Sequence, residues 1–554
     1  MIVNRFKNTF AERTFKNKYA QGPNDTWDAL ADRLVEDVCG SREGTVQVLM
    51  PDGDRKELAE HIKAMRFLPG GRYLYYAGRP YKAYNNCYLL RAEEDTREEW
   101  SNVTWRAMSC LMTGGGIGID YSKLRPEGKA LSRTGGTASG PIPLMSAINE
   151  IGRNVMQGGS RRSAIYASLN WQHEDIPKFL TIKNWDELTR SQKATNFNYA
   201  APLDMTNISV NYDDNALKSW NGVDDYGLQH NKVFQQNVRQ AMETGEPGFS
   251  FNFGSKQNET LRNACTEVTS EDDSDVCNLG SINLGNISSL EEFKNVVCLA
   301  SKFLVCGTLR ADLPYDKVYK VREKNRRLGL GLMGIHEWLL KRKQKYEVTK
   351  ELHEWLSVYR DESRRSADEH CDRFFISRPV AYRAIAPTGT IGILASTTTG
   401  IEPLFAVAYK RRYLTDGTKW KYEYVVDSTA DQLIKEYGLN PEDIDTAYKL
   451  SHDYERRIKF QADIQDYVDM SISSTINLPP WGSKGNSLHD VKGFTEILAR
   501  YATRLRGFTC YPDGSRGGQP ITECSYEEAT KHKGVVYEEV DICDITGRGG
   551  SCGS

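Results

Sequence analysis

The stretch "LRNACTEVTSEDDSDVCNLGSINL", residues 261–284, places a thiol between an amide and a carboxylate at every second position. If 263–267 is an extended strand, Asn263, Cys265 and Glu267 point to one face, because side chains alternate along a strand. In a helix the same three side chains would be spread around the axis, since each residue turns by about 100°. The extended interpretation therefore builds a site, and a further thiol, Cys277, follows twelve residues after Cys265.

The three residue types suggest a chemistry. Glu267 could serve as a general base, and Asn263 can donate a hydrogen bond to a hydroxyl or accept one from it. A neighbouring carboxylate raises the pKa of a thiol, which argues against an activated thiolate at Cys265. Radical or redox chemistry tolerates a neutral S–H group and is the functional hypothesis. A buried structural cysteine beside unrelated polar residues explains the same pattern, and both interpretations stay open.

Composition sets the class of protein. The 554-residue chain is 39% hydrophobic and 26% charged, as in ordinary globular proteins. Its net charge of −2 gives no bulk positive field for a nucleic acid polymer or an anionic membrane. No apolar run approaches the ~20 residues that span a bilayer, and the N-terminus lacks an apolar signal core. The twelve cysteines include no Cys-x-x-Cys pair and no zinc-type spacing, which predicts free thiols in a reducing cytoplasm and no metal site.

Helical and strand patterns alternate from about residue 85, which predicts an α/β fold rich in parallel strands. The predicted helices cover 26–40, 141–159, 428–438 with Ser428 as its cap, and 491–507. The predicted strands are 163–170, a segment around Ile208 and Val210, and 508–511.

The end of the chain differs in composition. "CDITGRGGSCGS", residues 543–554, is too rich in glycine and serine to pack as a core, yet it carries Cys543 and Cys552. It is either a frayed terminus with incidental thiols or a mobile arm that carries a dithiol.

An ordered set of motifs resembles one family. "NACTE" followed by "CNLGSINL" resembles the finger loop of ribonucleotide reductase catalytic subunits, whose pattern is Asn-x-Cys-x-Glu. Further segments are similar to family signatures in the same order: "NNCYLL" (85–90), "TGGGIGIDYSKLRP" (113–126), "APTGTIGILASTTTGIEPLF" (386–405) and "FTCYPDGSRGGQP" (508–520). The resemblance implies a ten-stranded α/β barrel of two antiparallel five-stranded halves around a central finger loop. The implied division is a mainly helical segment 1–80, the barrel domain 81–530 and a flexible redox tail 531–554.

The resemblance also implies roles for individual residues. Cys265 becomes a transient thiyl radical that removes the 3′ hydrogen of a ribonucleotide, Glu267 takes the 3′-hydroxyl proton, and Asn263 orients the hydroxyls. Cys87 and Cys277 donate two electrons and end as a disulfide. Cys543 and Cys552 match the tail dithiol that reduces this disulfide and is itself served by thioredoxin or glutaredoxin.

Substrate, effector and assembly expectations follow from the same resemblance. The implied substrate-binding residues are Asn86, Gly115, Gly116, Pro387, Thr388, Gly389 and Thr390. A homodimer is expected, with dNTP or ATP specificity effectors at its interface and with Arg125 and the loop near 186–198 as contacts. The N-terminal ATP-binding domain of many relatives is not expected.

The radical source separates the classes of this family. Class I members receive the radical from a metal-containing subunit through adjacent tyrosines on a late strand, but "GFTCYPDGSR" offers Thr509, Cys510 and Tyr511. The stretch resembles the class II form, which implies adenosylcobalamin as cofactor. A class I-type subunit is the alternative, and a non-catalytic nucleotide-binding module is a remote one. "GLGLMG" at 329–334 lacks the preceding apolar strand of a dinucleotide site, so we interpret its glycines as close helix packing.

Overall fold

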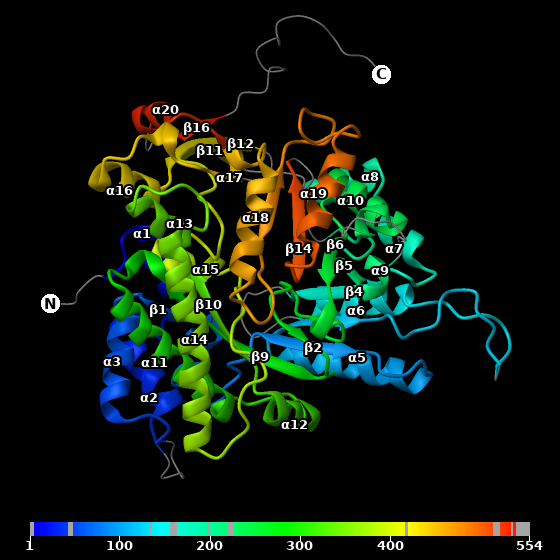
Figure 1. Cartoon of the computed structure of the whole chain (residues 1–554), viewed down its shortest axis with the longest axis horizontal. Helices are drawn as coiled ribbons and strands as arrows, with labels where there is room; N and C mark the ends of the chain where they lie inside the picture. Colours follow the sequence, from blue (N-terminus) through cyan, green and yellow to red (C-terminus); the bar gives the residue numbers. More distant parts are fainter. Residues whose placement is uncertain are drawn as a thin grey trace, which may run out of the picture.

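The computed structural model describes residues 5–41, 48–132, 134–155, 163–196, 199–218, 227–415, 419–513, 521–532 and 536–538. Four helices pack side by side on the left of Figure 1, and the strands β2 to β6 lie on the right. These helices are α2 (Trp27–Cys39), α3 (Asp52–Lys63), α11 (Leu290–Arg310) and α14 (Lys350–Arg373). Helix α2 confirms the helix predicted over 26–40, and its residues Leu30, Leu34 and Val38 are all buried.

One ten-stranded sheet organises the molecule, in the order β1-β9-β2-β3-β4-β5-β6-β14-β13 with β10 on the other side of β9. Its first half consists of five parallel strands: β2 (Cys87–Arg91), β3 (Gly116–Asp120), β4 (Ile165–Asn170), β5 (Thr206–Tyr212) and β6 (Gly248–Phe251). Helices α5 (Arg97–Met112), α6 (Ile142–Asn154) and α10 (Lys232–Thr244) lie in the crossover connections that parallel neighbours require. The predicted strands at 163–170 and around Ile208 and Val210 are confirmed.

The second half meets the first through antiparallel pairs at both ends. Strand β9 (Asp275–Asn283) pairs with β2, and β14 (Gly507–Pro512) pairs with β6. Next to them, β10 (Leu328–Met333) runs parallel to β9, β13 (Thr475–Leu478) runs parallel to β14, and β1 (Phe67–Pro69) runs antiparallel to β9. The sheet therefore reverses direction between its two halves.

The sheet is not closed by a continuous ladder within the described residues. Between β10 and β13 there are two isolated parallel bridges, Leu330 with Arg383 and Ile385 with Ile472. Two residues beyond Ile385 comes Pro387, which has no amide hydrogen to contribute to a ladder. The structure thus supports an α/β fold with a large mixed sheet. The described strands do not form the closed barrel that was expected.

Three local predictions were wrong. Helix α16 (Ser428–Tyr437) is capped by Asp427, whose side chain accepts hydrogen bonds from Thr429 and Ala430, so Ser428 is already helical. Helix α19 (Val491–Ala502) ends before Gly507, which begins β14. "GLGLMG" forms β10 and not a helix contact. A Cβ at Gly331 would lie 2.7 Å from the carbonyl oxygen of Ala384, so the glycine allows the backbone around Ala384 to approach the strand closely.

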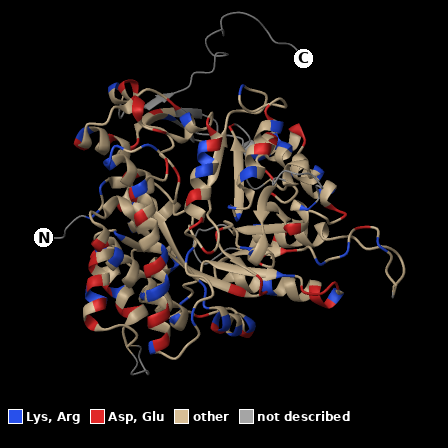
Figure 2. Ribbon diagram, in the orientation of Figure 1, with Lys and Arg blue, Asp and Glu red and all other residues tan. Residues whose placement is uncertain are grey.

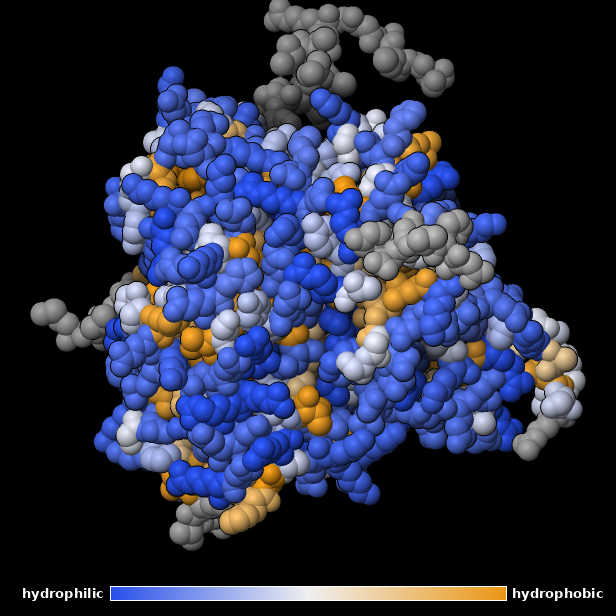
Figure 3. Space-filling view, viewed as in Figure 1, coloured by the Kyte–Doolittle hydropathy of each residue, from blue (hydrophilic) through white to orange (hydrophobic). Residues whose placement is uncertain are grey.

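The surface carries no dominant charge. Figure 2 shows acidic and basic residues interspersed along the helices, and Figure 3 shows a mainly hydrophilic face with scattered apolar residues. Throughout the described ranges, no helix is long and apolar enough to cross a membrane. Those ranges also contain no cluster of three or more His, Cys, Asp or Glu side chains that could hold a metal ion.

Candidate active site

The stretch 263–267 is a tight loop, as the resemblance to a finger loop implied, and it does not adopt the extended conformation that we considered from the alternation of residue types. It joins the short antiparallel strands β7 (Leu261–Arg262) and β8 (Thr269–Ser270). The amide of Thr266 donates to the carbonyl of Asn263 at 3.0 Å, and Thr266 has a φ of 70°. The turn places Asn263 and Glu267 at the base of the loop, each 1% exposed, and presents Cys265 at the exposed tip. We call residues 263–267 the finger loop.

Glycines on β3 admit the finger loop. A Cβ at Gly118 would lie 1.7 Å from the carbonyl oxygen of Arg262, and one at Gly116 would lie 3.1 Å from the Cβ of Ala264. From the other side, the buried guanidinium of Arg262 donates to the side chain of Asn252 at 2.6 Å, and burial lowers its pKa to about 9. The loop is therefore held by backbone contacts that side chains on β3 would prevent.

Cys87 and Cys277 face each other across β2 and β9, as directly paired residues of the antiparallel ladder. Such pairs have Cα atoms about 4.5–5.5 Å apart, a separation that a disulfide can span. Both residues are buried free thiols here. Burial raises the pKa of each thiol well above its usual value, so both are held in the protonated form.

The base of the finger loop touches this thiol pair. The side-chain Nδ2 of Asn263 donates to Cys87 Sγ at 2.9 Å, and Cys87 Sγ lies 3.9 Å from Glu267 Oε1. Glu267 Oε2 is buried and has no hydrogen-bond partner among the described residues. Burial raises the pKa of Glu267 to about 7. A carboxyl group poised near neutrality with one open oxygen is suited to proton transfer.

A cleft of about 180 Å³ opens beside the finger loop. Ten residues predicted from the sequence line it: Asn86, Cys87, Gly116, Asn263, Cys265, Glu267, Pro387, Thr388, Gly389 and Thr390. The site therefore brings together segments that are some 300 residues apart in the chain.

Other predicted residues lie elsewhere. Gly115 does not line the cleft, because its Cα faces the ring of Tyr88, which a Cβ would meet at 2.4 Å. Cys277 lies behind Cys87 in a small apolar cluster. Arg125 lies outside the cleft lining and is ion-paired with Asp95. Cys543 and Cys552 lie outside the described residues.

Known proteins are similar to this chain in sequence and in fold. The family model described as ribonucleotide reductase, barrel domain, matches residues 85–205, 210–354 and 378–502, which is more than half of the chain. This chain belongs to the ribonucleotide reductase family. A vitamin B12-dependent ribonucleoside-diphosphate reductase of Mycobacterium tuberculosis (strain CDC 1551 / Oshkosh) is 26% identical over 85% of this chain and 73% of its own length. A putative adenosylcobalamin-dependent ribonucleoside-triphosphate reductase of Mycobacterium phage D29 is 26% identical over 74% of this chain and 68% of its own length.

A solved structure has the same fold. The crystal structure of a B12-dependent, class II ribonucleotide reductase superimposes with a TM-score of 0.71 and 16% identity. The superposition covers 96% of this reductase and 95% of that chain.

The cleft of this reductase also contains residues that the sequence analysis did not assign. They are Tyr19, Gly70, Gly71, Arg72, Ala164, Ala264, Leu279, Gly280, Ser281, Ala386 and Ile391. Arg72 is 6% exposed, and its guanidinium rests on Gly114, where a Cβ would lie 2.0 Å away. A buried cation in the cleft suits an anionic ligand. Tyr19, which follows helix α1 (Thr9–Lys18), reaches the cleft from an N-terminal segment with no motif around it.

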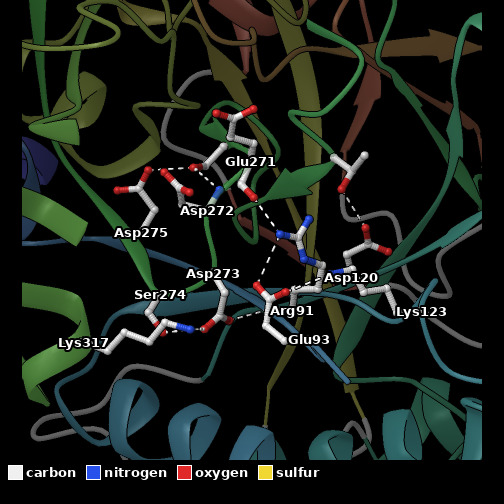
Figure 4. A network of polar contacts seen from close by, with 12 residues as sticks. Arg91, Glu93, Asp120, Lys123, Glu271, Asp272, Asp273, Ser274, Asp275 and Lys317 are labelled. Carbon is white, nitrogen blue, oxygen red and sulfur yellow. Dashed lines mark hydrogen bonds and ion pairs between the residues drawn. The ribbon is translucent and has the colours of Figure 1, made fainter. Parts of the chain in front are cut away.

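The loop between β8 and β9 is anchored by charge (Figure 4). Asp273 accepts hydrogen bonds from the Arg91 amide at 2.8 Å and from Lys317 Nζ at 2.6 Å. The guanidinium of Arg91 donates to the carbonyl of Glu271 at 2.7 Å. These contacts tie β2 to the start of β9 and so maintain the register in which Cys87 faces Cys277.

Proposed function

We propose that this chain is a class II ribonucleotide reductase, which converts ribonucleoside di- or triphosphates to 2′-deoxyribonucleotides with a radical generated from adenosylcobalamin. One observation carries the proposal: an exposed thiol, a buried carboxyl with its pKa near 7, and Cys87 of the cross-strand thiol pair line one cleft. Relatives named as vitamin B12-dependent support the choice of class.

The side chains divide the reaction between them. The Cys265 thiyl radical takes the hydrogen atom from C3′ of the ribose, and Glu267 accepts the proton of the 3′-hydroxyl. The 2′-hydroxyl then leaves as water with a proton from the thiol pair. Cys87 and Cys277 supply two electrons and two protons in all, and end as a disulfide. Cys265 finally returns its hydrogen atom to C3′, so that the net change is one ribose reduced, one dithiol oxidised and one water released.

When bound, adenosylcobalamin supplies the organic radical that takes the hydrogen atom from the Cys265 thiol. We place such a group at the wall beside the tip of the finger loop. Gly507 of β14 faces the loop, since a Cβ there would lie 3.7 Å from Thr266 Oγ1. Thr509 shares this face of the strand, and its hydroxyl donates to the carbonyl of Ser474 at 2.9 Å. Gly507, Thr509 and the loop tip would hold the cofactor.

The same wall argues against the class I alternative. A radical delivered through the protein needs a redox-active tyrosine facing the receiving thiol, and the loop-facing positions of β14 nearest the finger loop carry Gly507 and Thr509.

We assign the substrate phosphates to the segment 387–390 and to Arg72. Helix α15 (Gly389–Ala395) begins in the cleft, and the first amides of a helix have no intrahelical acceptor. A Cβ at Gly389 would meet nothing within 4 Å, so the backbone there is open to a ligand. Thr388 has a φ of 52° and its hydroxyl accepts from the Gly400 amide at 2.8 Å, which fixes the turn into the helix.

The domain architecture is part of the proposal. We infer a ten-stranded barrel over 81–530, preceded by the segment 1–80. The two isolated bridges through Arg383 and Ile385 support it, because they follow the path that closure would take. The tail 531–554 would carry Cys543 and Cys552 to the Cys87–Cys277 disulfide and receive electrons from thioredoxin or glutaredoxin. The glycine-rich composition of 543–554 supports a mobile arm there, whereas Val536–Glu538 form strand β16, paired with β12 (Lys419–Val426), and are not part of a free arm. The thiol chemistry suits a reducing cytoplasm.

We further propose a homodimer with nucleotide effectors at its interface. Helix α5 exposes Trp105, Met108 and Met112 by 56%, 37% and 63%, and their spacing places them on one helical face. An apolar stripe of this kind fits a second copy of the chain. Arg125 pairs with Asp95, which lies just before α5, so the expected effector contact is close to this face.

The decisive test is anaerobic reduction of CDP and CTP by the purified chain with a dithiol, with and without adenosylcobalamin. Deoxynucleotide formed by the isolated chain only when the cofactor is present is the expected result. Product that appears only after addition of an iron- or manganese-loaded second subunit would reverse the choice of class.

A further inference from the structure

The two thiols of the cross-strand pair have unequal surroundings. Cys87 lines the cleft, whereas Cys277 is completely buried behind it. A thiol that arrives through the cleft therefore meets Cys87 Sγ first. Thiol–disulfide exchange proceeds with the attacking sulfur, the attacked sulfur and the departing sulfur nearly in line, so attack from this side requires Cys277 to depart.

A buried arginine lies beside the thiol that would depart. Strand β10 runs parallel to β9 with Leu328 opposite Asn278, so Arg327 is level with Cys277. Side chains at neighbouring positions of adjacent strands share a face. Two contacts agree with this placement: Arg327 Nε donates to Asp275 Oδ2 at 2.6 Å, and a Cβ at Gly329 would lie 3.1 Å from Cys277 Sγ. Asp275 is two residues before Cys277, and Gly329 is two residues after Arg327. Both contacts therefore place the side chains of Arg327 and Cys277 on the same face of the sheet.

Arg327 keeps donor capacity for a further anion. Its side chain is 4% exposed, and its Nη1 atom is buried without a hydrogen-bond partner in the part of the chain that the structure describes. The charged groups that influence Cys277 are Asp275, Glu267 and Arg327, and only Arg327 favours the thiolate. A buried donor left open beside a thiol is explained if that thiol carries a negative charge at one stage of the cycle.

We propose that Arg327 is a positioning residue that makes Cys277 the departing sulfur, and Cys87 the attacked sulfur, when a dithiol reduces the Cys87–Cys277 disulfide. The inference rests on the redox role proposed above for this pair. In the first step a thiolate of the reductant forms a bond to Cys87 Sγ. The Cys87–Cys277 bond breaks, and its electron pair stays on Cys277 as a thiolate facing the guanidinium.

The second step restores both thiols. The other thiolate of the reductant attacks the reductant sulfur of the mixed disulfide, forms the reductant's own disulfide and releases Cys87. The two protons of the reductant end on Cys277 and Cys87, so that two electrons and two protons enter the pair. Disulfide exchange is faster when the departing thiol is more acidic, and the guanidinium supplies this at a buried sulfur that water does not solvate.

Trapping with 5,5′-dithiobis(2-nitrobenzoic acid) tests the direction of attack. In Cys277→Ser, Cys87 is expected to form the mixed disulfide, which peptide mass mapping assigns among the other thiols. In Cys87→Ser, Cys277 is expected to react at least about 10-fold more slowly, because it does not line the cleft. Faster labelling of Cys277 in Cys87→Ser than of Cys87 in Cys277→Ser would overturn the proposed order.

The rate of reduction tests Arg327. The oxidised pair is reduced with dithiothreitol in Arg327→Gln, Arg327→Lys and the wild type, with no nucleotide and no cofactor. Arg327→Gln is expected to slow reduction about 10-fold, and Arg327→Lys to retain most of the rate because it keeps the charge. Equal rates in Arg327→Gln and the wild type would refute the role.

Two controls separate this effect from damage to the fold. Arg383→Gln removes another arginine that is 4% exposed and ion-paired, at 2.7 Å to Asp469, but not beside Cys277, and should leave the reduction rate unchanged. Asp275→Asn combined with Arg327→Gln avoids an orphaned carboxylate, and because Asp275 itself disfavours the Cys277 thiolate, the double variant is compared with Asp275→Asn alone and should be reduced more slowly than that variant. These rates do not depend on ribonucleotide turnover. Slow reduction in Arg327→Gln together with a wild type that forms no deoxynucleotide would therefore count against the proposed function alone, whereas a wild type that turns over but is reduced no faster than Arg327→Gln would count against Arg327 alone.

Discussion

The finger loop and the β2–β9 strand pair hold their thiols in opposite ways. The finger loop is irregular, includes a residue at positive φ, and presents Cys265 at an exposed tip. The strand pair is regular, and its ladder places Cys87 directly opposite Cys277 in the interior. A thiol that exchanges hydrogen atoms with two partners needs access from both, whereas two thiols that must form one bond need a defined separation. The loop provides the access, and the ladder register provides the separation.

Changing the tip should have the largest effect. In Cys265→Ser the O–H bond is too strong to replace the thiol in hydrogen-atom exchange, so deoxynucleotide formation should fall by at least about 1,000-fold. The radical signal seen by electron paramagnetic resonance should disappear as well. Cys298→Ser, on helix α11 and outside the cleft lining, is the matched control and should retain both. Turnover near the wild-type rate in Cys265→Ser would contradict the assignment of hydrogen-atom exchange to the tip of the finger loop.

Changing the strand pair should separate the two functions. Cys87→Ser and Cys277→Ser each lack one of the electron donors, so product formation with a dithiol should become undetectable. The tip is intact in both variants, and the radical signal should persist when cofactor and substrate are added. Quantifying the signal and the product in the same sample makes the comparison direct. Loss of the signal in both variants would mean that the strand pair also supports radical formation.

The sequence predicted the regular half of the molecule better than the irregular half. Alternating patterns located β4 and β5, and the order of motifs brought Asn263, Cys265, Glu267 and Cys87 to one cleft. The family resemblance implied a loop at 263–267, but the alternation of residue types suggested an extended strand, because nothing in the side chain of Thr266 indicates its positive φ, which the surrounding contacts impose.

Residues far from any motif were also missed. Tyr19 reaches the cleft only through the packing of helix α1 against α15, a tertiary contact that local patterns do not encode. Arg72 stands in "FLPGGRYLYYAG" at 67–78, a stretch that precedes all of the motifs from which the site was predicted. Gly115, predicted to contact substrate, instead makes room for Tyr88, because a glycine run shows where backbones approach closely without showing what approaches.

The base of the loop can be tested through its proton. Glu267→Gln keeps the shape but removes the base, and kcat/KM should fall about 100- to 1,000-fold. In the wild type kcat/KM should rise with pH through about 7, because the pKa of Glu267 is raised to that value and the ionised form accepts the proton. The variant should lack this rise. A wild-type profile that is flat between pH 5.5 and 8.5 would exclude Glu267 as the titrating base.

The same residue should affect stability in the opposite direction. The carboxyl has a pKa of about 7 when folded and 4.5 as its ordinary value, so the folded state binds the proton more tightly between these values. Its contribution to stability is complete below pH 4.5 and is lost as pH rises through 7, by up to about 3 kcal/mol. Glu267→Gln should therefore be more stable than the wild type at pH 8, and this gain should vanish near pH 4.5. Urea unfolding at both pH values measures it.

Substitution in the wall of the cleft should have the smallest effect. Arg72 is proposed to contact substrate phosphate and not the reacting atoms, so its interaction is present equally in the bound substrate and the transition state. Arg72→Met should raise KM about 10-fold with little change in kcat, the pattern expected when uniform binding is lost. Arg72→Lys, which keeps the charge, should lie between the two. If kcat falls in Arg72→Met while KM is unchanged, Arg72 acts on the finger loop or on Gly114, and the phosphates must be assigned to 387–390 alone.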